Sequence, residues 1–132
     1  MGEISWPQDL RYNKQHQWVR VEGDVARSGI THFGQESLGD IVFIYLPKVG
    51  DRLAADARLL DIESTKVIWE LFMPLSGEIV EVNQALDATP ELINQDPHGA
   101  GWILAIRFDD ASQLDAMLDA GVYAAFLASG EA

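Results

Sequence analysis

The chain contains 132 residues, 48% of them apolar, which predicts one globular domain long enough to bury a core. Its formal net charge of −12 excludes nucleic-acid binding, which needs clustered Lys and Arg, argues against anionic membrane surfaces and favours partners with basic docking surfaces. The absence of cysteine excludes disulfides, thiolate metal sites and thiol redox chemistry from the chain's own side chains.

Residues 1–9 are expected to form a flexible leader ahead of a single domain over residues 10–132. The first ten residues have neither the apolar stretch of a secretory signal nor the arginine-rich pattern of a transit peptide. No apolar run approaches the length that crosses a membrane. We therefore expect a cytoplasmic protein without a membrane partner.

Strand-like stretches of apolar residues alternate with turn residues along most of the chain. The predicted strands are residues 17–21, 25–29, 40–46, 78–82 and 102–108. Residues 39–44 and 77–82 share one pattern of Gly, an acid, Ile and Val, and the same offset places Ser28 opposite Lys66. This repeat predicts a sandwich of two antiparallel sheets with approximate two-fold symmetry.

Three helical segments are predicted between and after these strands. Residues 31–38 form a short helix capped by Thr31, and Thr89 with Pro90 opens a single helical turn. After Asp109, one amphipathic C-terminal helix is predicted, weakened near Gly121. Its apolar face consists of Leu114, Met117, Leu118, Val122, Ala125 and Phe126.

Lys66 is the only lysine or arginine between Arg58 and Arg107. Apolar runs of strand length flank it, which predicts a β-hairpin with the lysine at its turn. A primary amine on a rigid turn, away from other cations, is well placed for covalent modification. On this stretch alone, an ordinary surface lysine is the simpler interpretation.

Four longer stretches follow one another in a characteristic order: residues 11–23, residues 29–31 with 35–40, residues 63–66 with 74–83, and residues 90–102. Together they resemble the H protein of the glycine cleavage system, a lipoyl carrier. The resemblance runs from about Leu10 into the C-terminal helix. It implies a mainly β, lipoyl-domain-like (hammerhead) sandwich of two antiparallel sheets with short flanking helices and a C-terminal helix.

The resemblance also implies that Lys66 carries lipoic acid in amide linkage and that the protein is a non-catalytic carrier. Glu63 and Gly77 match positions that the family presents to the lipoylating enzyme, and dihydrolipoamide dehydrogenase is a further expected partner. The lipoyl dithiolane would supply the thiol–disulfide couple that the cysteine-free chain lacks. Biotin-carrier domains share the fold but place Met on both sides of the lysine, whereas Thr65 and Val67 flank it here, so biotin is not expected.

Departures from the glycine-cleavage pattern favour a different cargo. Gln17 replaces the carboxylate of the family's His-Glu-Trp motif, Ser37 stands where the family can carry His, and apolar residues separate Lys66 from Glu70. Gln17, Ser37, Trp69 and Glu70 are expected to line the pocket of the lipoyl arm or to contact a partner. A cationic aminomethyl arm needs acceptor groups, so the missing carboxylate favours the sulfur-carrying branch that serves a heterodisulfide-reductase-like complex.

Two further hypotheses stay open. One is the aminomethyl carrier of the glycine cleavage enzymes, and the other is an unmodified H-fold binding module that recruits partners through the hairpin of Trp69. A zinc site is not expected, because His16, His32 and His98 are far apart in the sequence and have no cysteine companions. These histidines are interpreted as surface or turn residues, with His16 near the resting place of the arm.

Overall fold

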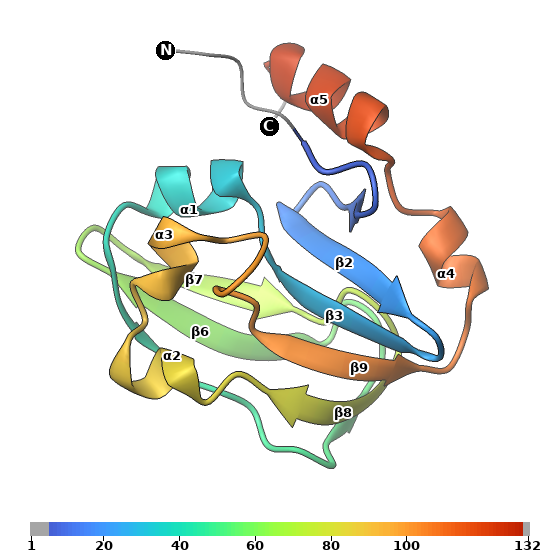
Figure 1. Ribbon diagram of the computed structural model, residues 1–132, viewed down its shortest axis with the longest axis horizontal. Coiled ribbons are helices and arrows are strands. Elements are labelled where there is room, and N and C mark those ends of the chain that lie inside the picture. The colour runs from blue at the N-terminus through green and yellow to red at the C-terminus, as the bar shows by residue number, and fades with distance from the viewer. Residues whose placement is uncertain (1–5, 131–132) are drawn as a thin grey trace.

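The computed structural model describes residues 6–130, which form two antiparallel β-sheets packed against each other and flanked by short helices (Figure 1). One sheet has six strands and the other has three. This arrangement confirms the predicted mainly β sandwich of two antiparallel sheets with a helical C-terminus.

The six-stranded sheet has the strand order β1 (Arg11–Tyr12), β2 (Gln17–Glu22), β3 (Val25–Ile30), β9 (Leu104–Phe108), β8 (Gly77–Val82) and β5 (Arg52–Leu53). The three-stranded sheet has the order β4 (Ile41–Ile44), β6 (Arg58–Ser64) and β7 (Ile68–Phe72). The helices are α1 (His32–Leu38), α2 (Ala85–Ala88), α3 (Leu92–Gln95), α4 (Ser112–Asp115) and α5 (Ala120–Ala128). In Figure 1, α1, α2 and α3 lie on the same side as the turn between β6 and β7, whereas α4 and α5 lie on the other side.

The main core lies between the two sheets and is built by the period of two along each strand. In β6, Leu60 and Ile62 are buried, whereas Asp61 and Glu63 alternate with them and face the other way. The buried residues of this core are Ile30, Leu38, Ile41, Ile44, Leu60, Ile62, Leu71, Met73, Ile79, Leu86, Ile93, Ile103, Leu104 and Ile106. Leu86 of α2 and Ile93 of α3 are buried in this core, and Leu92 of α3 packs against it while partly exposed, so these side chains fix the two four-residue helices to the sandwich.

A second, aromatic core attaches α5 to the beginning of the chain. Tyr12 stacks on Tyr123 with 4.7 Å between ring centroids and 4° between ring planes. Trp6 packs edge-on against both rings, and the Tyr12 hydroxyl donates to the carbonyl oxygen of Pro7 at 2.8 Å. Trp6 and Pro7, which fall in the predicted leader, are therefore part of this packing, while residues 1–5 of that prediction lie outside the described residues.

The predicted single C-terminal helix is two helices. The chain leaves helical geometry between α4 and α5, and Asp119 caps α5 by accepting a hydrogen bond from the Val122 N–H at 2.8 Å. Gly121 therefore lies inside α5 rather than at a break. The buried residues of α5 are Ala120 and Tyr123, whereas Val122, expected on the apolar face, is 51% exposed.

The segment after β8 also differs from the prediction, because α2 has no counterpart among the predicted elements. Thr89 ends α2, with its N–H donating to the carbonyl oxygen of Ala85 at 2.9 Å, so it does not cap the following helix. The helical turn after Pro90 exists, but α3 begins only at Leu92.

The internal repeat corresponds to strands in different sheets. Residues 39–44 contain β4, and residues 77–82 form β8. Ser28, the position equivalent to Lys66, is buried in β3, where its hydroxyl donates to the carbonyl oxygen of Trp18 at 2.7 Å. The repeat therefore relates two strands and does not relate two hairpin turns.

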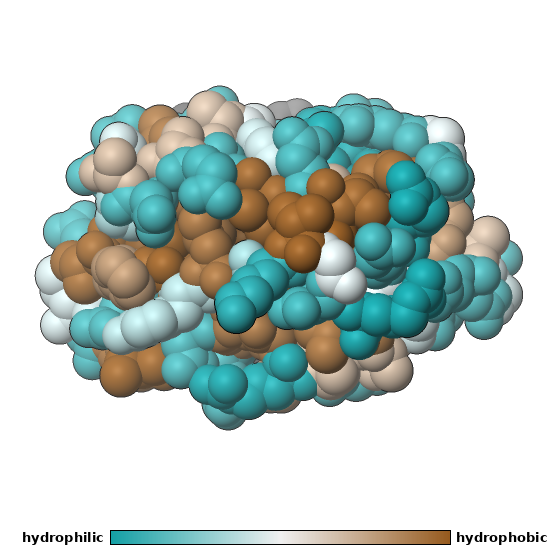
Figure 2. Space-filling model, turned by 90° about the horizontal axis from the view of Figure 1, so that it is seen from below, coloured by the Kyte–Doolittle hydropathy of each residue, from teal (hydrophilic) through white to brown (hydrophobic). Residues whose placement is uncertain are grey.

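The surface combines the acidic side chains with exposed apolar ones. On the side that faces downward in Figure 1, apolar side chains form a broken band between polar ones (Figure 2). The large exposed apolar residues are Val21, Val42, Phe43, Tyr45, Val49, Val67, Ile68 and Val122. Half of them belong to β4, β7 or the turn before β7, so they are concentrated on the three-stranded sheet. Within residues 6–130, no helix has the length and apolar character needed to cross a membrane.

Gly77→Ala is expected to lower the free energy of unfolding by about 1–3 kcal/mol, because overpacking forces neighbouring backbone apart. A Cβ at this position would collide with the carbonyl oxygen of Arg107 and lie 2.9 Å from Cγ2 of Ile106, where β8 pairs with β9. The matched control is Gly121→Ala in α5, whose Cβ would meet nothing closer than Asp119 Oδ1 at 3.6 Å. The control should gain about 0.5–1 kcal/mol. Urea unfolding measures both variants, and an unchanged stability for Gly77→Ala would contradict the close approach.

Candidate functional site

Lys66 lies at the turn between β6 and β7, as the sequence predicts. The turn closes with the Ser64 N–H donating to the carbonyl oxygen of Val67 at 2.9 Å. The Ser64 hydroxyl accepts hydrogen bonds from the backbone N–H groups of Lys66 and Val67, at 3.2 and 3.1 Å. The Thr65 N–H donates to the carbonyl oxygen of Asp40 at 3.0 Å, which ties the turn to the segment before β4. The turn is therefore held from two sides, with the Lys66 side chain exposed.

The Lys66 side chain extends over Gly39, the residue that follows α1. Gly39 has a φ of +77°, and a Cβ there would lie only 2.9 Å from Lys66 Cε. Lys66 Nζ makes no hydrogen bond or ion pair with any residue between 6 and 130. The amine is therefore accessible to an enzyme that would acylate it, with no hydrogen bond or ion pair to break first.

Asn94 of α3 organises the backbone beneath this lysine. Its Nδ2 donates to the carbonyl oxygen of Gly39 at 2.8 Å and to Gln35 Oε1 at 3.0 Å. Its Oδ1 accepts a hydrogen bond from the Ile41 N–H at 3.0 Å. One amide side chain thus joins α3, the end of α1 and the start of β4.

A cleft of about 340 Å³ adjoins the lysine turn, between α1 and the start of β7. Its lining residues are His16, Phe33, Ser37, Leu38, Val67, Ile68 and Trp69. Val67 follows Lys66 directly, so the cleft begins one residue from the amine. Of the residues expected to line an arm pocket, Ser37 and Trp69 do line this cleft, as does His16.

His16 brings a neutral polar group to the cleft. It lies in a turn with a φ of +64°, yet its side chain is buried, and its Nδ1 is 2.8 Å from the hydroxyl of Tyr123. That hydroxyl is in turn 2.8 Å from Thr31 Oγ1. Burial lowers the pKa of His16 below its ordinary value of 6.5, so the imidazole is uncharged near pH 7. Among the described residues, no carboxylate lines the cleft.

Gln17 lies outside the cleft and has a structural reason to be an amide. It is 2% exposed, and its Nε2 donates to the carbonyl oxygen of Phe72 at 2.7 Å. Its Oε1 accepts a hydrogen bond from Asn13 Nδ2 at 2.8 Å. A glutamate here would have no N–H for the Phe72 carbonyl and would place two acceptors together.

The other predicted site residues lie on different surfaces. Glu63 and Glu70 are on the outer face of the three-stranded sheet, where Glu63 accepts a hydrogen bond from the Tyr45 hydroxyl at 2.9 Å and Glu70 pairs with Arg58 at 2.7 Å. Gly77 begins β8 in the other sheet and is buried against β9. The structure therefore places Glu63 beside the Lys66 turn and Glu70 outside the cleft. The start of β8, where Gly77 lies, is away from the turn between β6 and β7 (Figure 1).

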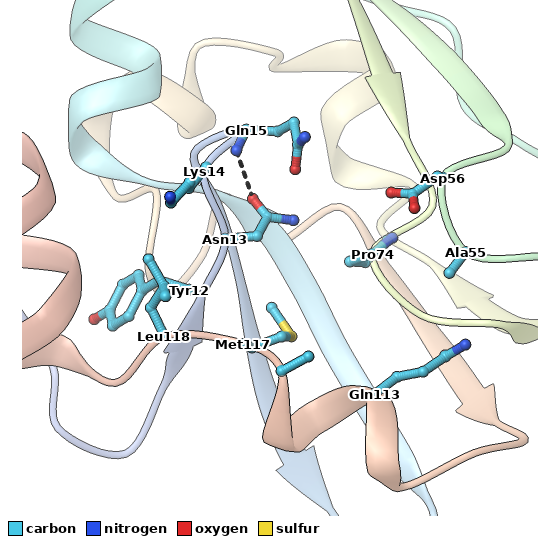
Figure 3. A pocket seen from close by; sticks show the side chains of 11 residues that line it. Tyr12, Asn13, Lys14, Gln15, Ala55, Asp56, Pro74, Gln113, Met117 and Leu118 are labelled. Atoms are coloured by element: carbon cyan, nitrogen blue, oxygen red, sulfur yellow. Dashed lines mark hydrogen bonds between the residues drawn. The ribbon is translucent and has the colours of Figure 1, made fainter. Parts of the chain in front are cut away.

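A second hollow, also about 340 Å³, lies between the β1–β2 turn and α4 (Figure 3). Its lining residues are Tyr12, Asn13, Lys14, Gln15, Ala55, Asp56, Pro74, Gln113, Ala116, Met117 and Leu118. None of the predicted site residues belongs to it. Lys14 turns toward α5, where its Nζ lies 5.3 Å from the centroid of the Phe126 ring. Its ammonium group therefore makes a cation–π contact with α5.

Several residues of the site were not singled out from the sequence. Phe33 is one of them, although it lies four residues before Ser37 in a predicted helix, and that spacing indicates one face shared with a residue already expected at the site. A serine two residues before the turn lysine is typical of a hydroxyl that bonds local backbone N–H groups, which is the role of Ser64. The role of Asn94 could not be predicted from local sequence, because its hydrogen-bond partners are 53 to 59 residues away in the chain. Across residues 6–130, no three His, Asp or Glu side chains gather where they could hold a metal ion.

The residues around Lys66 fit the lipoyl group that the resemblance implies. The largely apolar walls of the cleft, including Phe33, Ile68 and Trp69, would contact the aliphatic arm and the dithiolane ring. Ser37 and His16 add two polar side chains to the lining. When bound, the group supplies the thiol–disulfide couple that the chain does not have.

The chain is similar in sequence and in structure to known proteins over nearly its whole length. A family model described as the glycine cleavage H-protein matches residues 10–130. The glycine cleavage system H protein of Symbiobacterium thermophilum is 48% identical over 124 residues, which cover 94% of this chain and 97% of that protein. The protein of the same name from Bacillus subtilis is 46% identical over 120 residues, covering 91% and 94%. The crystal structure of a glycine cleavage system H protein from Mycobacterium marinum has a TM-score of 0.80 and 37% identity, covering 91% of this chain and 97% of that one.

Ser64→Ala is expected to loosen the lysine turn, because two backbone N–H groups lose their shared acceptor. The free energy of unfolding should fall by about 1 kcal/mol, and amide hydrogen exchange at Lys66 and Val67 should become faster. Thr65→Ala is the matched control, since the exposed Thr65 side chain makes no hydrogen bond with a described residue. NMR-detected exchange measures both variants. Exchange rates that are equal in Ser64→Ala and the parent would show that the hydroxyl does not hold the turn.

Proposed function

Because the chain belongs to the glycine cleavage H-protein family, we propose that it carries the aminomethyl group of a glycine cleavage system on a lipoyl group attached to Lys66. The protein is a non-catalytic carrier, and its family carries lipoic acid covalently bound to a lysine. The observation that best supports Lys66 is its position as an exposed, unpartnered amine on a rigid turn directly beside a largely apolar cleft.

The relatives support the aminomethyl cargo more than the sulfur cargo that the sequence favoured. The sulfur hypothesis depended on three departures from the family pattern: Gln17 in place of a carboxylate of the arm pocket, Ser37 in place of His, and the apolar run after Lys66. Gln17 is instead buried and hydrogen-bonded to Asn13 and Phe72. These two hydrogen bonds explain why the residue is a glutamine, without reference to the cargo. No observation supports a heterodisulfide-reductase-like partner.

The cleft also has groups that suit a protonated amine. A neutral imidazole and a hydroxyl, from His16 and Ser37, are acceptors that cost less to bury than an unpaired carboxylate. The net charge of −12 surrounds the site with a negative field that favours a cation. An aminomethyl arm therefore does not need a carboxylate inside the cleft.

The proposed partners follow from this role. They are the glycine cleavage enzymes, the lipoylating enzyme that modifies Lys66, and dihydrolipoamide dehydrogenase, which returns the dithiol to the disulfide. Each is expected to meet the acidic surface with a basic one, which speeds encounter at low salt. The remaining hypothesis, an unmodified H-fold binding module, needs no lipoyl group and is tested by the first experiment below.

Protein made in cells that lipoylate their own carriers should gain the mass of one lipoyl group, and peptide mapping should place it on Lys66. Lys66→Arg should remove the mass gain and leave the unfolding midpoint nearly unchanged, because an exposed turn side chain contributes little to stability. Lys14→Arg and Lys48→Arg are the controls and should keep the modification. An unmodified parent protein would favour the binding module, and a lipoyl group on Lys14 or Lys48 would refute the assignment.

The lipoylated protein should accept the aminomethyl group from glycine in the presence of a purified glycine decarboxylase. Incubation with carbon-labelled glycine and intact-mass analysis measure the loading, with an established H protein as the positive control. Gln17→Glu should lower the free energy of unfolding by about 1–3 kcal/mol without faster loading, because it removes the N–H that the Phe72 carbonyl accepts. Gln15→Glu, at an exposed position of the same turn, controls for the added charge. A parent protein that stays unloaded while the positive control is loaded would refute the proposed cargo.

A further inference from the structure

Gly39, between α1 and β4, makes a contact that the other described glycines with positive φ do not make. Its φ is +77°, and a Cβ on it would lie 2.9 Å from Lys66 Cε and 3.8 Å from Lys66 Nζ. Gly23, Gly50 and Gly130 also have positive φ, but a Cβ on any of them would meet no atom within 4 Å. The stem of Lys66 therefore lies directly on the backbone of Gly39, in space that the missing side chain leaves open.

An apolar stem can cover Gly39 because both of its backbone polar groups already have partners. Its N–H donates to the carbonyl oxygen of Gln35 at 3.0 Å, and its carbonyl oxygen accepts from Asn94 Nδ2 at 2.8 Å. Covering a peptide group with methylene groups is unfavourable only when that group is left without a hydrogen bond. Asn94 thereby removes the penalty of laying the lysine stem across this residue.

The segment that begins with Gly39 is fixed both to the helices and to the lysine turn. Asn94 Oδ1 accepts from the Ile41 N–H at 3.0 Å, so one side chain of α3 holds the residues on either side of Asp40. The carbonyl oxygen of Asp40 accepts from the Thr65 N–H, within the lysine turn, at 3.0 Å. Gly39 is therefore held at a defined position relative to the turn that carries the lysine.

The position of Gly39 gives the lysine stem a direction. Ser37 and Leu38, which line the cleft, come directly before Gly39. Val67, which also lines the cleft, comes directly after Lys66. A stem that lies on Gly39 thus leaves the turn toward the end of α1, where the cleft begins. Amide formation removes the charge of the amine, so the whole stem then favours an apolar surface over water.

We propose that Gly39 is the seat of the lipoylated Lys66 stem, and that Asn94 is a positioning residue which, by holding the Gly39 carbonyl, directs the lipoyl arm from the turn into the cleft. This inference rests on the proposed lipoylation of Lys66, although the seat is already present in the unmodified chain. A stem held in this way has fewer rotamers to lose when the arm enters the cleft, which favours the enclosed arm over the free one.

Gly39→Ala tests the seat, with Gly23→Ala as the matched control. The φ of both positions is unfavourable for alanine, so both variants should lose a similar amount of stability in urea unfolding. Only Gly39→Ala should displace the lysine, because the atom that the new Cβ meets is near the free end of a flexible side chain. The chain has only the lysines Lys14, Lys48 and Lys66, so NMR of protein made with isotope-labelled lysine resolves the two Hε protons of Lys66. These protons should have separate shifts in the parent and in Gly23→Ala, and one averaged shift in Gly39→Ala.

Asn94→Ala tests the positioning role, with Asn83→Ala as the matched control. Asn83 also makes three hydrogen bonds, since its Nδ2 donates to the carbonyl oxygens of Ala100 and Trp102 and its Oδ1 accepts from the Ala85 N–H. Both variants should have a lower unfolding midpoint. Only Asn94→Ala should merge the two Hε shifts of the turn lysine.

Alkylation of the reduced lipoyl thiols by N-ethylmaleimide measures the direction of the arm in the whole lipoylated chain. Gly39→Ala and Asn94→Ala should react about fivefold faster than the parent, because an arm without its seat is exposed for more of the time. Gly23→Ala and Asn83→Ala should react at the parent rate.

Separate Hε shifts in Gly39→Ala, or one averaged shift in the parent, would refute the seat whether or not the chain is lipoylated. Equal alkylation rates in the parent and all variants would refute the direction of the arm while leaving lipoylation of Lys66 intact. A parent chain that a lipoylating enzyme leaves unmodified, while it modifies an established H protein, would refute the proposed function and the direction of the arm together. The Hε shifts of the unmodified lysine would then still decide the seat.

Discussion

The hydroxyl of Ser64 bonds the backbone of one four-residue turn, accepting from two N–H groups and donating to the Val67 carbonyl oxygen at 3.1 Å. The rest of the candidate site depends on this closure, because a lysine on a loose loop would carry no defined direction. Ser64 is buried and Lys66 is exposed, so the constraint lies inside the sheet and the reactive amine lies outside it. A partner enzyme then meets the amine without first having to order the turn, which would cost conformational entropy.

The cleft beside the turn is a consequence of how α1 is held. Asn94 ties the end of α1 to β4, and the Thr31 hydroxyl caps the start of the helix by accepting from the Gly34 N–H at 3.1 Å. Gly34 permits a close approach to β7, since a Cβ there would lie 3.4 Å from Trp69 Cη2 and 3.3 Å from His16 Cβ. Both ends of the helix are therefore fixed, and the space left between it and the hairpin is the cleft.

The sequence predicted the fold and the lysine turn well, because both follow from local patterns. Alternating apolar residues and Gly or Pro at turns place strands, and Thr31 caps α1 as its residue type predicts. The apolar pattern did not predict the division between α4 and α5, because apolar residues continue with helical spacing across the turn between them. Asp119 ends that turn and caps α5. Local patterns did not predict the whole cleft either, because its walls come from three segments whose contact only the tertiary fold determines; Ser37, Trp69 and His16 were expected near the arm from the family resemblance. The sheet topology of 1-2-3-9-8-5 and 4-6-7 is likewise a property of long-range pairing.

Strand periodicity explains why only part of the predicted arm pocket was brought together. Trp69 and Glu70 are adjacent in β7, and adjacent strand residues point to opposite faces, so they cannot both line one cleft. Trp69 faces the core and the cleft, whereas Glu70 joins Arg58 on the outer face. The same alternation in β6 puts Ser64 inside and Glu63 outside. One hairpin thereby separates two tasks, with the inner residues holding the turn and shaping the cleft while the outer residues stay available to a partner.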